Sequence, residues 1–489
     1  MRLFPMNLGQ ARARLVQAGA VVAAAALVAG CGSAYRPVVT PVNSSGPAAQ
    51  PSSYAVVVSA PSPTTPGIAT IIDYSGDTVM AQAPIGPGPT TFTVDETGTN
   101  GYTVNSDGTI TNFPISTSLQ AKMVSYTTLA TTSRPVGLFS PSAGLWIADL
   151  DGNVAGVFNG SPATFKLDIP VAIAPVTIVG PSVFGQRNYA ISQNFDAPSG
   201  SVPNGVACNL SPSTAPVNGE ADALETSTNT VSARIPLGKC PVFAVQGADN
   251  KRFFVLNRGS DTITVINSQN NTLDSCTPFV NQNGQTVTCH PSLPVSPAPG
   301  LTHAGPVYAE YSAATSQLVV ANYDGNSISV IDVSLDEYGN DSPAFGTTFT
   351  IPVGSNPASV TVLADASRAY TANQSDGTVT IVNLSSHTVE KTLPVIGHPR
   401  TVVSTQNSSY GKVYVSSPDS PYLTILRTDQ DIVDTTVLVQ GNIVDVRVTT
   451  SNAVSGNSNS NSRNPGHGQP CYLPGSTAAA TLAACQRLP

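Results

Sequence analysis

The chain has 489 residues, only 10% of them charged, with a formal net charge of −8. It contains 40 Gly and 41 Pro, and Val, Ile and Thr outnumber the helix formers Glu, Lys, Gln and Met. This composition disfavours a helical bundle or a doubly wound α/β enzyme. With 21 basic against 29 acidic residues, no basic face is available for phosphates, so we expect no nucleic-acid binding. The composition predicts an all-β, exported protein.

The first 30 residues have the pattern of an export signal. Arg2, Arg12 and Arg14 precede an apolar run over residues 15–30. At about sixteen residues, that run is shorter than the ~20 that a spanning helix needs. Its end, Leu27-Val28-Ala29-Gly30-Cys31, resembles the bacterial lipobox.

The resemblance implies that residues 1–30 are removed and that Cys31 is lipidated. The alternative is an ordinary secretory signal followed by an incidental Cys. Several acyl chains anchor a protein firmly, whereas one binds only marginally. The residue after the Cys is Gly32 and not Asp. In this respect the chain resembles proteobacterial lipoproteins that are sent to the outer membrane. Residues 31–53, rich in Pro, Ser and Ala, are predicted to be a lipidated tether, and the membrane is contacted through that anchor only.

Residues 54–450 repeat a two-strand unit. A short apolar strand ends in Asn, Asp or Ser, and a turn leads to a second, alternating strand. The clearest copies are 253–257 with 261–267, 318–322 with 326–332, and 369–373 with 377–383. Units recur roughly every 43 to 51 residues, apart from two longer spacings that carry insertions, and most close with a Gly-x-x-Pro-like step. Weaker copies start near Tyr102, Leu145, Tyr189, Val413 and Tyr54.

This repeat resembles the YVTN-type repeats of bacterial and archaeal surface propellers. The resemblance implies a β-propeller of four-stranded antiparallel blades, for which the family default is seven blades. Eight second strands are countable, so we favour eight blades, with seven as the alternative. The run 442–448 is then the inner strand of a blade whose other strands come from residues 54–83. Such a ring, closed by the N- and C-terminal strands, leaves no exposed edge.

Asp-Gly turns invite a calcium interpretation, most of all Asp149-Leu150-Asp151-Gly152. A calcium loop needs further carboxylates at alternate positions and a late bidentate Glu, which are missing. Because the pair recurs at the same place in several units, we interpret it as turn chemistry and expect no metal. The chain also lacks a Gly-x-Ser-x-Gly elbow, a Gly-rich phosphate loop and a haem-attachment motif, so we predict no catalytic residue and no cofactor.

Four residues are candidates for a binding site. Arg134, Lys239, His303 and His398 precede the Pro residues that start inner strands, so in a propeller they surround one mouth of the central channel. A polar binding site there is the functional interpretation, and ordinary solvated loop residues are the alternative.

Six cysteines remain once Cys31 is assigned to lipid, and an even number in an exported chain predicts disulfides. Fifteen connectivities are allowed; neighbours in sequence and blade geometry favour Cys208–Cys240, Cys276–Cys289 and Cys471–Cys485. The first pair would tie the insertion at about 192–219 to the next blade.

After the repeats, residues 451–470 are a low-complexity linker and 471–489 a small C-terminal knob. Two functions fit the whole chain. The favoured one is a monomeric, non-catalytic envelope propeller that binds a protein or polysaccharide. The alternative is an envelope hydrolase or lactonase with its site in the channel mouth.

Overall fold

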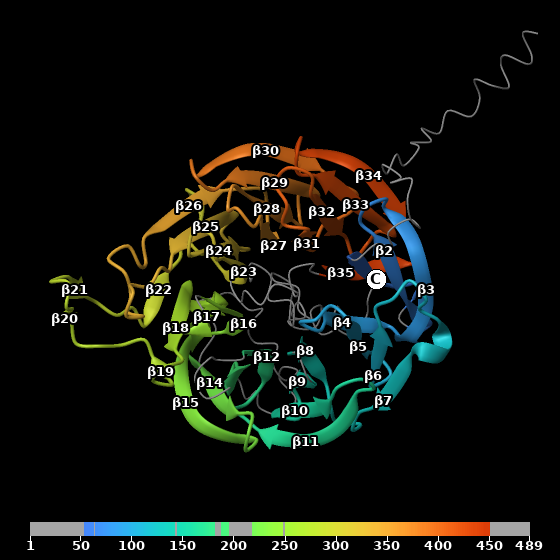
Figure 1. Ribbon diagram of the computed structural model, residues 1–489, viewed down its shortest axis with the longest axis horizontal. Helices are drawn as coiled ribbons and strands as arrows, with labels where there is room; N and C mark the ends of the chain where they lie inside the picture. The colour runs from blue at the N-terminus through green and yellow to red at the C-terminus, as the bar shows by residue number, and fades with distance from the viewer. Residues whose placement is uncertain are drawn as a thin grey trace, which may run out of the picture. The chain divides into compact units, whose positions relative to one another are not determined.

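The computed structural model describes residues 53–62, 64–141, 144–180, 187–194, 218–247 and 250–449. These residues form eight antiparallel sheets around a central axis, and in seven of them the strand that comes first in the chain is innermost (Figure 1). The all-β propeller prediction is therefore confirmed, and the blade number is eight. We number the blades 1 to 8 in chain order.

Blades 1 to 4 each have four strands, and we give them from the inside outwards. Blade 1 contains β35 (Asn442–Val448), β1 (Tyr54–Ala60), β2 (Pro66–Asp73) and β3 (Thr78–Pro87). Blade 2 contains β4 (Pro89–Val94), β5 (Asn100–Asn105), β6 (Thr109–Pro114) and β7 (Ser125–Thr128), with the 3-10 turn η1 (Ala121–Met123) before β7. Blade 3 contains β8 (Pro135–Phe139), β9 (Leu145–Asp149), β10 (Val154–Asn159) and β11 (Thr164–Pro170). Blade 4 contains β12 (Pro175–Val179), β13 (Arg187–Ser192), β14 (Asn218–Glu225) and β15 (Thr230–Lys239).

Blades 5 to 8 follow the same order, except that the outer strand of blade 5 is split. Blade 5 contains β16 (Pro241–Gln246), β17 (Arg252–Asn257), the 3-10 turn η5 (Arg258–Ser260), β18 (Thr262–Asn267), β19 (Thr272–Leu273) and β22 (Ser292–Pro294). Between its two outer pieces lies a separate hairpin of β20 (Phe279–Val280) and β21 (Thr286–Val287). Blade 6 contains β23 (Pro306–Ser312), β24 (Gln317–Asn322), β25 (Ser327–Asp332) and β26 (Thr348–Pro352). Blade 7 contains β27 (Pro357–Val362), β28 (Arg368–Asn373), β29 (Thr378–Asn383) and β30 (Thr388–Pro394). Blade 8 contains β31 (Thr401–Ser404), β32 (Lys412–Ser416), β33 (Tyr422–Arg427) and β34 (Ile432–Leu438).

The ring is closed by the C-terminal strand, as predicted. β35 pairs antiparallel with β1, with Val57 opposite Val446 and Ala55 opposite Val448. The backbone N–H of Tyr54 donates to Thr449 Oγ1 at 2.7 Å, and the Thr449 N–H donates to the Tyr54 carbonyl at 2.8 Å. Blade 1 therefore takes its inner strand from one end of the repeat region and its other three strands from the other end.

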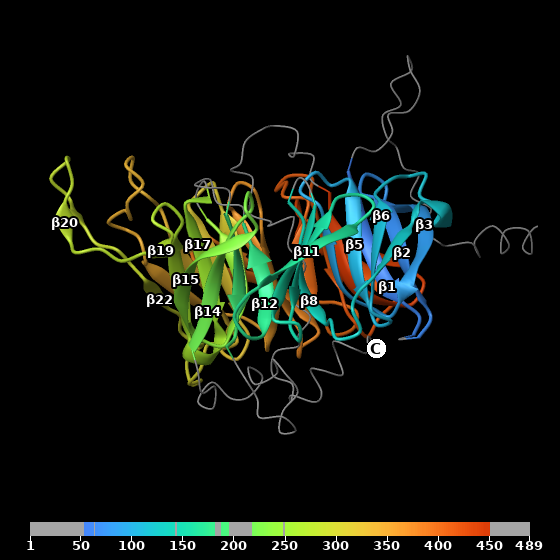
Figure 2. The ribbon, with the colours of Figure 1, turned by 90° about the horizontal axis from the view of Figure 1, so that it is seen from below.

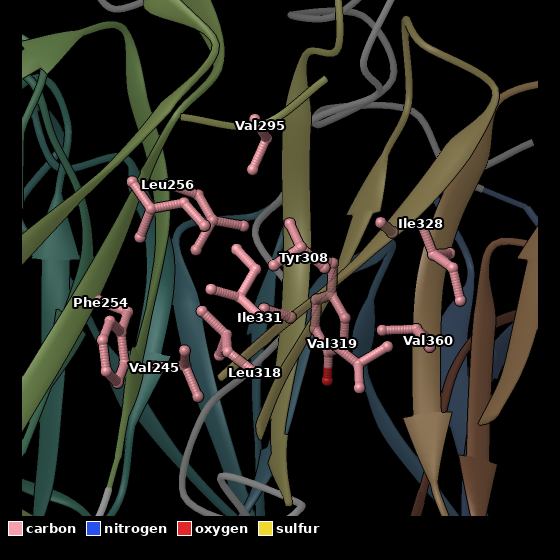
Figure 3. Close-up of a cluster of buried hydrophobic side chains, with 14 of the residues drawn as sticks. Val245, Phe254, Leu256, Val295, Tyr308, Leu318, Val319, Ile328, Ile331 and Val360 are labelled. Atoms are coloured by element: carbon pink, nitrogen blue, oxygen red, sulfur yellow. The ribbon is translucent and has the colours of Figure 1, made fainter. Parts of the chain in front are cut away.

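Burial along a blade explains the sequence pattern of each unit. The three inner strands are buried on both faces, as in β28, whose residues after Arg368 are all buried. The outer strand is largely exposed, as in β30. Side chains alternate between the two faces of a strand, and both faces of an inner strand pack against neighbouring blades. Figure 3 shows one such interface, where Phe254 and Leu256 of blade 5 and Leu318 and Val319 of blade 6 belong to one buried cluster.

The repeated Asn at the end of the second strand ties that strand to the third. Asn257, Asn322 and Asn373 are fully buried. The Nδ2 of Asn373 donates to Thr378 Oγ1 at 3.0 Å and to Thr380 Oγ1 at 2.8 Å. The amides of Asn257 and Asn322 make the same pair of bonds to hydroxyls five and seven residues later. A buried amide needs such partners, which explains why Asn is followed by alternating Thr or Ser.

The Gly of the Gly-x-x-Pro step packs directly on this asparagine. A Cβ added to Gly238 would lie 2.7 Å from Asn257 Cγ, and one added to Gly354 would lie 2.7 Å from Asn373 Cγ. No side chain fits at that distance, so Gly is required by close approach. The two halves of the sequence motif are separated by the inner and the second strand of a blade, and they form a single contact.

One of the three predicted disulfides lies wholly within the described residues. Cys276 and Cys289 are bonded, with their Cα atoms 5.5 Å apart, which confirms that pair. Cys240 is also disulfide-bonded. Cys31, Cys208, Cys471 and Cys485 lie outside the described residues, as do the signal, most of the tether, the linker and the knob. Across the part of the chain that is described, no helix is both long and apolar enough to cross a membrane.

Candidate functional site

One face of the ring collects two sets of turns, and we call this face the mouth. The first set, the entering turns, leads from an outer strand into the inner strand of the next blade. The second set joins the second strand of a blade to its third. The two sets are hydrogen-bonded: the Ser355 N–H of an entering turn donates to Asp376 Oδ2 at 2.5 Å, and the Leu129 N–H donates to the Gly108 carbonyl at 2.9 Å.

All four candidate residues lie on entering turns or at their start, so the structure places them on the mouth. Arg134 and His398 each pair with an Asp of the second–third turn in their own blade. The Arg134 guanidinium makes two bonds to Asp151, at 2.8 and 2.7 Å. His398 Nδ1 lies 2.6 Å from Asp419 Oδ2. Burial alone would raise the pKa of Asp419, but hydrogen bonds from the backbone and ring of His398 hold that pKa below its usual value.

His303 pairs across a blade boundary. Its Nδ1 lies 3.1 Å from Oδ2 of Asp261, which belongs to the second–third turn of blade 5, whereas His303 precedes blade 6. The other oxygen of Asp261 accepts the N–H groups of Ala304 and Gly305, at 3.0 and 2.8 Å. Asp261 therefore fixes the whole entering turn of blade 6.

Lys239 stands beside the same turn. Its backbone N–H donates to Ser260 Oγ at 3.2 Å, next to Asp261. Among the described residues, no carboxylate lies within ion-pair distance of its ammonium, so its charge is not neutralised by them. The structure thus brings Lys239 and His303 together through Ser260 and Asp261. Arg134 and His398 lie on the same mouth but in separate blades.

The same series of contacts continues into blades 6 and 7. The guanidinium of Arg258 binds Asp324 through two bonds of 2.8 Å, and its carbon lies 5.7 Å from the centre of the Tyr323 ring. The Tyr323 hydroxyl donates to Gln374 Oε1 at 3.1 Å. Burial raises the pKa of Tyr323 to about 12, so it stays a hydrogen-bond donor. We call the contiguous set Lys239, Arg258, Ser260, Asp261, His303, Tyr323, Asp324 and Gln374 the arc.

Polar side chains of inner strands from different blades also contact one another. Arg447 of β35 pairs with Asp445 at 2.9 Å and also interacts with the Tyr308 hydroxyl of β23. Burial raises the pKa of Tyr308 to about 12. Glu310, also on β23, accepts the N–H of Val362 at 2.8 Å. These strands belong to blades 1, 6 and 7, so the Arg447–Tyr308 contact joins two blades that are not neighbours, and the Glu310–Val362 contact joins two that are (Figure 1).

The two Asp residues of the turn at residues 149–152 make hydrogen bonds to this turn and to the entering turn of the same blade. Asp149 Oδ1 accepts the backbone N–H groups of Arg134 at 2.8 Å and Gly152 at 3.1 Å. Asp151 is used by the Arg134 guanidinium. The carboxylates of Asp149 and Asp151 therefore both bind the entering turn of blade 3.

Sequence reasoning missed the acidic partners and Arg258. The Asp residues of the second–third turns were recognised only as turn formers, and Arg258 was not singled out. Their partners lie 17 to 66 residues away, as in Arg134–Asp151 and Arg258–Asp324. One signal was present: an Asp recurs within the second–third turn of blades 2, 3, 5, 6, 7 and 8.

Comparison with known proteins supports the fold and goes no further. No family model matches the chain, and no curated protein matches it. Among solved structures, AztD from Citrobacter koseri is similar with a TM-score of 0.54 at 12% identity, covering 81% of this chain and 97% of AztD. The dihydro-heme d1 dehydrogenase NirN, solved in complex with DHE, is similar with a TM-score of 0.54 at 13% identity, covering 84% of this chain and 79% of NirN. At such identities the likeness concerns the fold alone, because one fold hosts many functions.

Proposed function

We propose that this protein is a non-catalytic, lipid-anchored propeller of the bacterial cell envelope that binds a protein or polysaccharide partner at the mouth. The arc is the observation that carries the proposal. It connects residues of blades 4 to 7, Lys239 through its backbone N–H and the other residues through their side chains. A surface whose polar groups are already held in place loses less entropy when a partner binds.

The charges of the arc favour a polar, multi-contact partner. Arg258 and His303 are each paired with a carboxylate, whereas none of the described carboxylates forms an ion pair with Lys239. The side chains of His303 and Asp324 remain 40% and 22% exposed, so a ligand can reach one member of each pair. Carbohydrate hydroxyls and the polar rim of a protein interface both suit such a surface.

The long insertion of blade 4 strengthens the choice of the mouth. It joins β13 to β14, so it begins and ends at second–third turn positions on this face. Loops tolerate insertion and carry function more often than the strands they connect. Asn218, the first described residue after the insertion, pairs with Lys239, and the predicted Cys208–Cys240 bond would restrain the insertion there.

Anchoring through Cys31 in the outer membrane is part of the proposal, and it rests on the lipobox resemblance. We expect the Cys31→Ala variant to leave the membrane fraction and appear in the soluble envelope fraction, because acyl chains supply the attachment. Fractionation in high salt measures this. Unchanged sedimentation with membranes would show that another attachment exists.

Reversing the charge of Lys239 tests the mouth. A partner captured by the full chain from detergent-solubilised envelope should bind Lys239→Glu up to about fivefold more weakly, since a surface charge contributes up to about 1 kcal/mol. The matched control is Lys251→Glu, in the first–second turn of blade 5 on the opposite face. Quantitative capture at two salt concentrations provides the comparison. A larger loss for Lys251→Glu would place the binding surface on the other face.

An envelope hydrolase or lactonase is the second candidate, and one geometric feature favours it. His398 and Asp419 form an exposed pair at 2.6 Å, the arrangement in which a carboxylate orients a general base. NirN, an enzyme by its description, shares the fold. If His398→Gln removed a hydrolytic activity while leaving capture of the partner intact, the enzyme interpretation would replace ours.

A further inference from the structure

A lateral lobe projects from the rim of blades 5 and 6, away from the mouth. It consists of residues 274–290, which interrupt the outer strand of blade 5, and residues 333–346, which join β25 to β26. Its hairpin, β20 with β21, stands clear of the ring in both views (Figures 1 and 2). Blades 7 and 8 complete their four strands without such excursions, so the propeller itself does not require the lobe.

The lobe is held rigidly at its base. The Cys276–Cys289 bond closes the stem of the hairpin. Just outside that bond, Asp274 and His290 join a buried charge cluster: Arg252 Nη2 lies 3.2 Å from both Asp274 and Asp341, and His290 Nδ1 lies 2.8 Å from Asp341. The side chains of Arg252, Asp274 and Asp341 are at most 3% exposed. The cluster connects the hairpin stem to both blades.

The outer part of the lobe exposes apolar and acidic groups together. Phe279 and Val280 of β20 are 43% and 66% exposed, and Tyr338 of the facing loop is 46% exposed. Asn283 Nδ2 donates to Glu337 Oε1 at 2.8 Å, which joins the hairpin to the acidic loop. Burial alone would raise the pKa of Asp336, but hydrogen bonds from Asn340 hold that pKa below its usual value. This carboxylate is therefore ionised at neutral pH.

The charge of this sector is one-sided. The chain has no Lys or Arg from residue 259 to residue 367. Asp274 and Asp341 are used by Arg252, which leaves Asp336 and Glu337 as the acidic groups near the lobe surface. A second copy of this lobe would bring like charges together, whereas a basic segment would be attracted.

We propose that the lateral lobe is a docking site for an extended, basic segment of a partner protein, which adds a strand along β20. In the described part of the chain, the sheet of β20 and β21 has only these two strands, so each has an open edge. An added strand would satisfy the unpaired backbone groups. Its apolar residues would cover Phe279 and Val280, and its Lys or Arg residues would face Asp336 and Glu337. This surface is separate from the arc.

The probe is a fluorescent ten-residue peptide of alternating Lys and Val, titrated against the full chain by fluorescence anisotropy. We expect saturable binding that weakens with salt, and no binding of the peptide in which Glu replaces Lys. Val280→Ser and Glu337→Lys should each weaken the peptide at least about fivefold. The matched controls are Val389→Ser and Glu390→Lys on β30, both exposed on an outer strand, and they should bind as the unmodified chain does.

Equal affinity of lobe and control variants would overturn the proposal, as would equal binding of the Glu peptide. Sedimentation that shows lobe-dependent self-association would assign the surface to a second copy and also overturn it. The amides of Phe279 and Val280 should exchange more slowly when the peptide is bound, and unchanged exchange would exclude strand addition. Lys239→Glu should leave peptide binding unchanged, so failure here is distinct from failure of the mouth.

Discussion

Val446→Asp is expected to destabilise the protein by about 4 kcal/mol or more, because it places an unpaired charge inside the closure of the ring. Val446 is fully buried and packs in one cluster with Ala55 and Val57 of blade 1 and Tyr414 and Leu423 of blade 8. The residue therefore stabilises the junction between the last blade and the first. Denaturant unfolding, followed by tyrosine fluorescence and circular dichroism, measures the loss.

The matched control is Val433→Asp on β34, the outer strand of blade 8. Val433 is 38% exposed, so its carboxylate stays hydrated and the unfolding midpoint should hardly move. Buried clusters span neighbouring blades, as this one spans blades 8 and 1, so opening the ring should also broaden the transition. An equally sharp, unshifted transition for Val446→Asp would mean that β35 does not close the ring.

Arg252→Ala is expected to be the second largest loss, about 3 to 5 kcal/mol, since two buried carboxylates would remain without their cation. Asp274 and Asp341 both contact the same Nη2 atom of Arg252. Arg427→Ala, which breaks a half-exposed pair with Asp429 on blade 8, is the control and should leave the unfolding midpoint unchanged. If the two substitutions lowered the free energy of unfolding equally, the buried cluster would stabilise the protein no more than a surface ion pair does.

The same cluster predicts a pH dependence. Burial, followed by the nearby Asp274 charge, raises the pKa of Asp341 to about 6 from the ordinary 3.8, with His290 and Arg252 opposing the shift. The folded state therefore holds a proton more tightly than the unfolded state. This contribution is fully present below about pH 4 and is lost as the pH rises through about 6.

In Asp341→Asn, the free energy of unfolding should depend less on pH and should not fall as the pH rises through about 6. Urea unfolding of both proteins from pH 4 to pH 8 compares them. A variant whose stability falls as steeply as that of the unmodified chain would assign the titration to another group.

The fold could be predicted because its signals are local and repeated. Each unit carries an apolar strand ending in Asn, a turn, and alternating Thr or Ser, and these residues contact one another within the blade, as Asn373 contacts Thr378 and Thr380. Eight copies of the second strand determined eight blades. The closure could also be predicted, because the strand at 442–448 had no blade of its own and the strands at 54–83 lacked an inner strand. Pairing the two completes one blade.

The candidate site was predictable only in part. Entering-turn residues were found because a Pro at or just before the start of most inner strands marks their position. Their acidic partners were missed, since Arg258 and Asp324 lie 66 residues apart and no local pattern links them. The cluster of Arg252 with Asp341, 89 residues later, was missed for the same reason. Long-range pairing depends on how blades sit together, which spacing alone does not specify.

Binding at the mouth is tested most directly by photo-crosslinking from the two faces of one blade. The p-benzoylphenylalanine group replaces Ser375, exposed in the second–third turn of blade 7, or Ala364, exposed in its first–second turn on the opposite face. Both variants are irradiated in intact cells. We predict that position 375 forms a crosslinked partner species that Lys239→Glu diminishes, and that position 364 does not form it. The same species formed equally well from position 364, or no species from position 375, would contradict binding at the mouth.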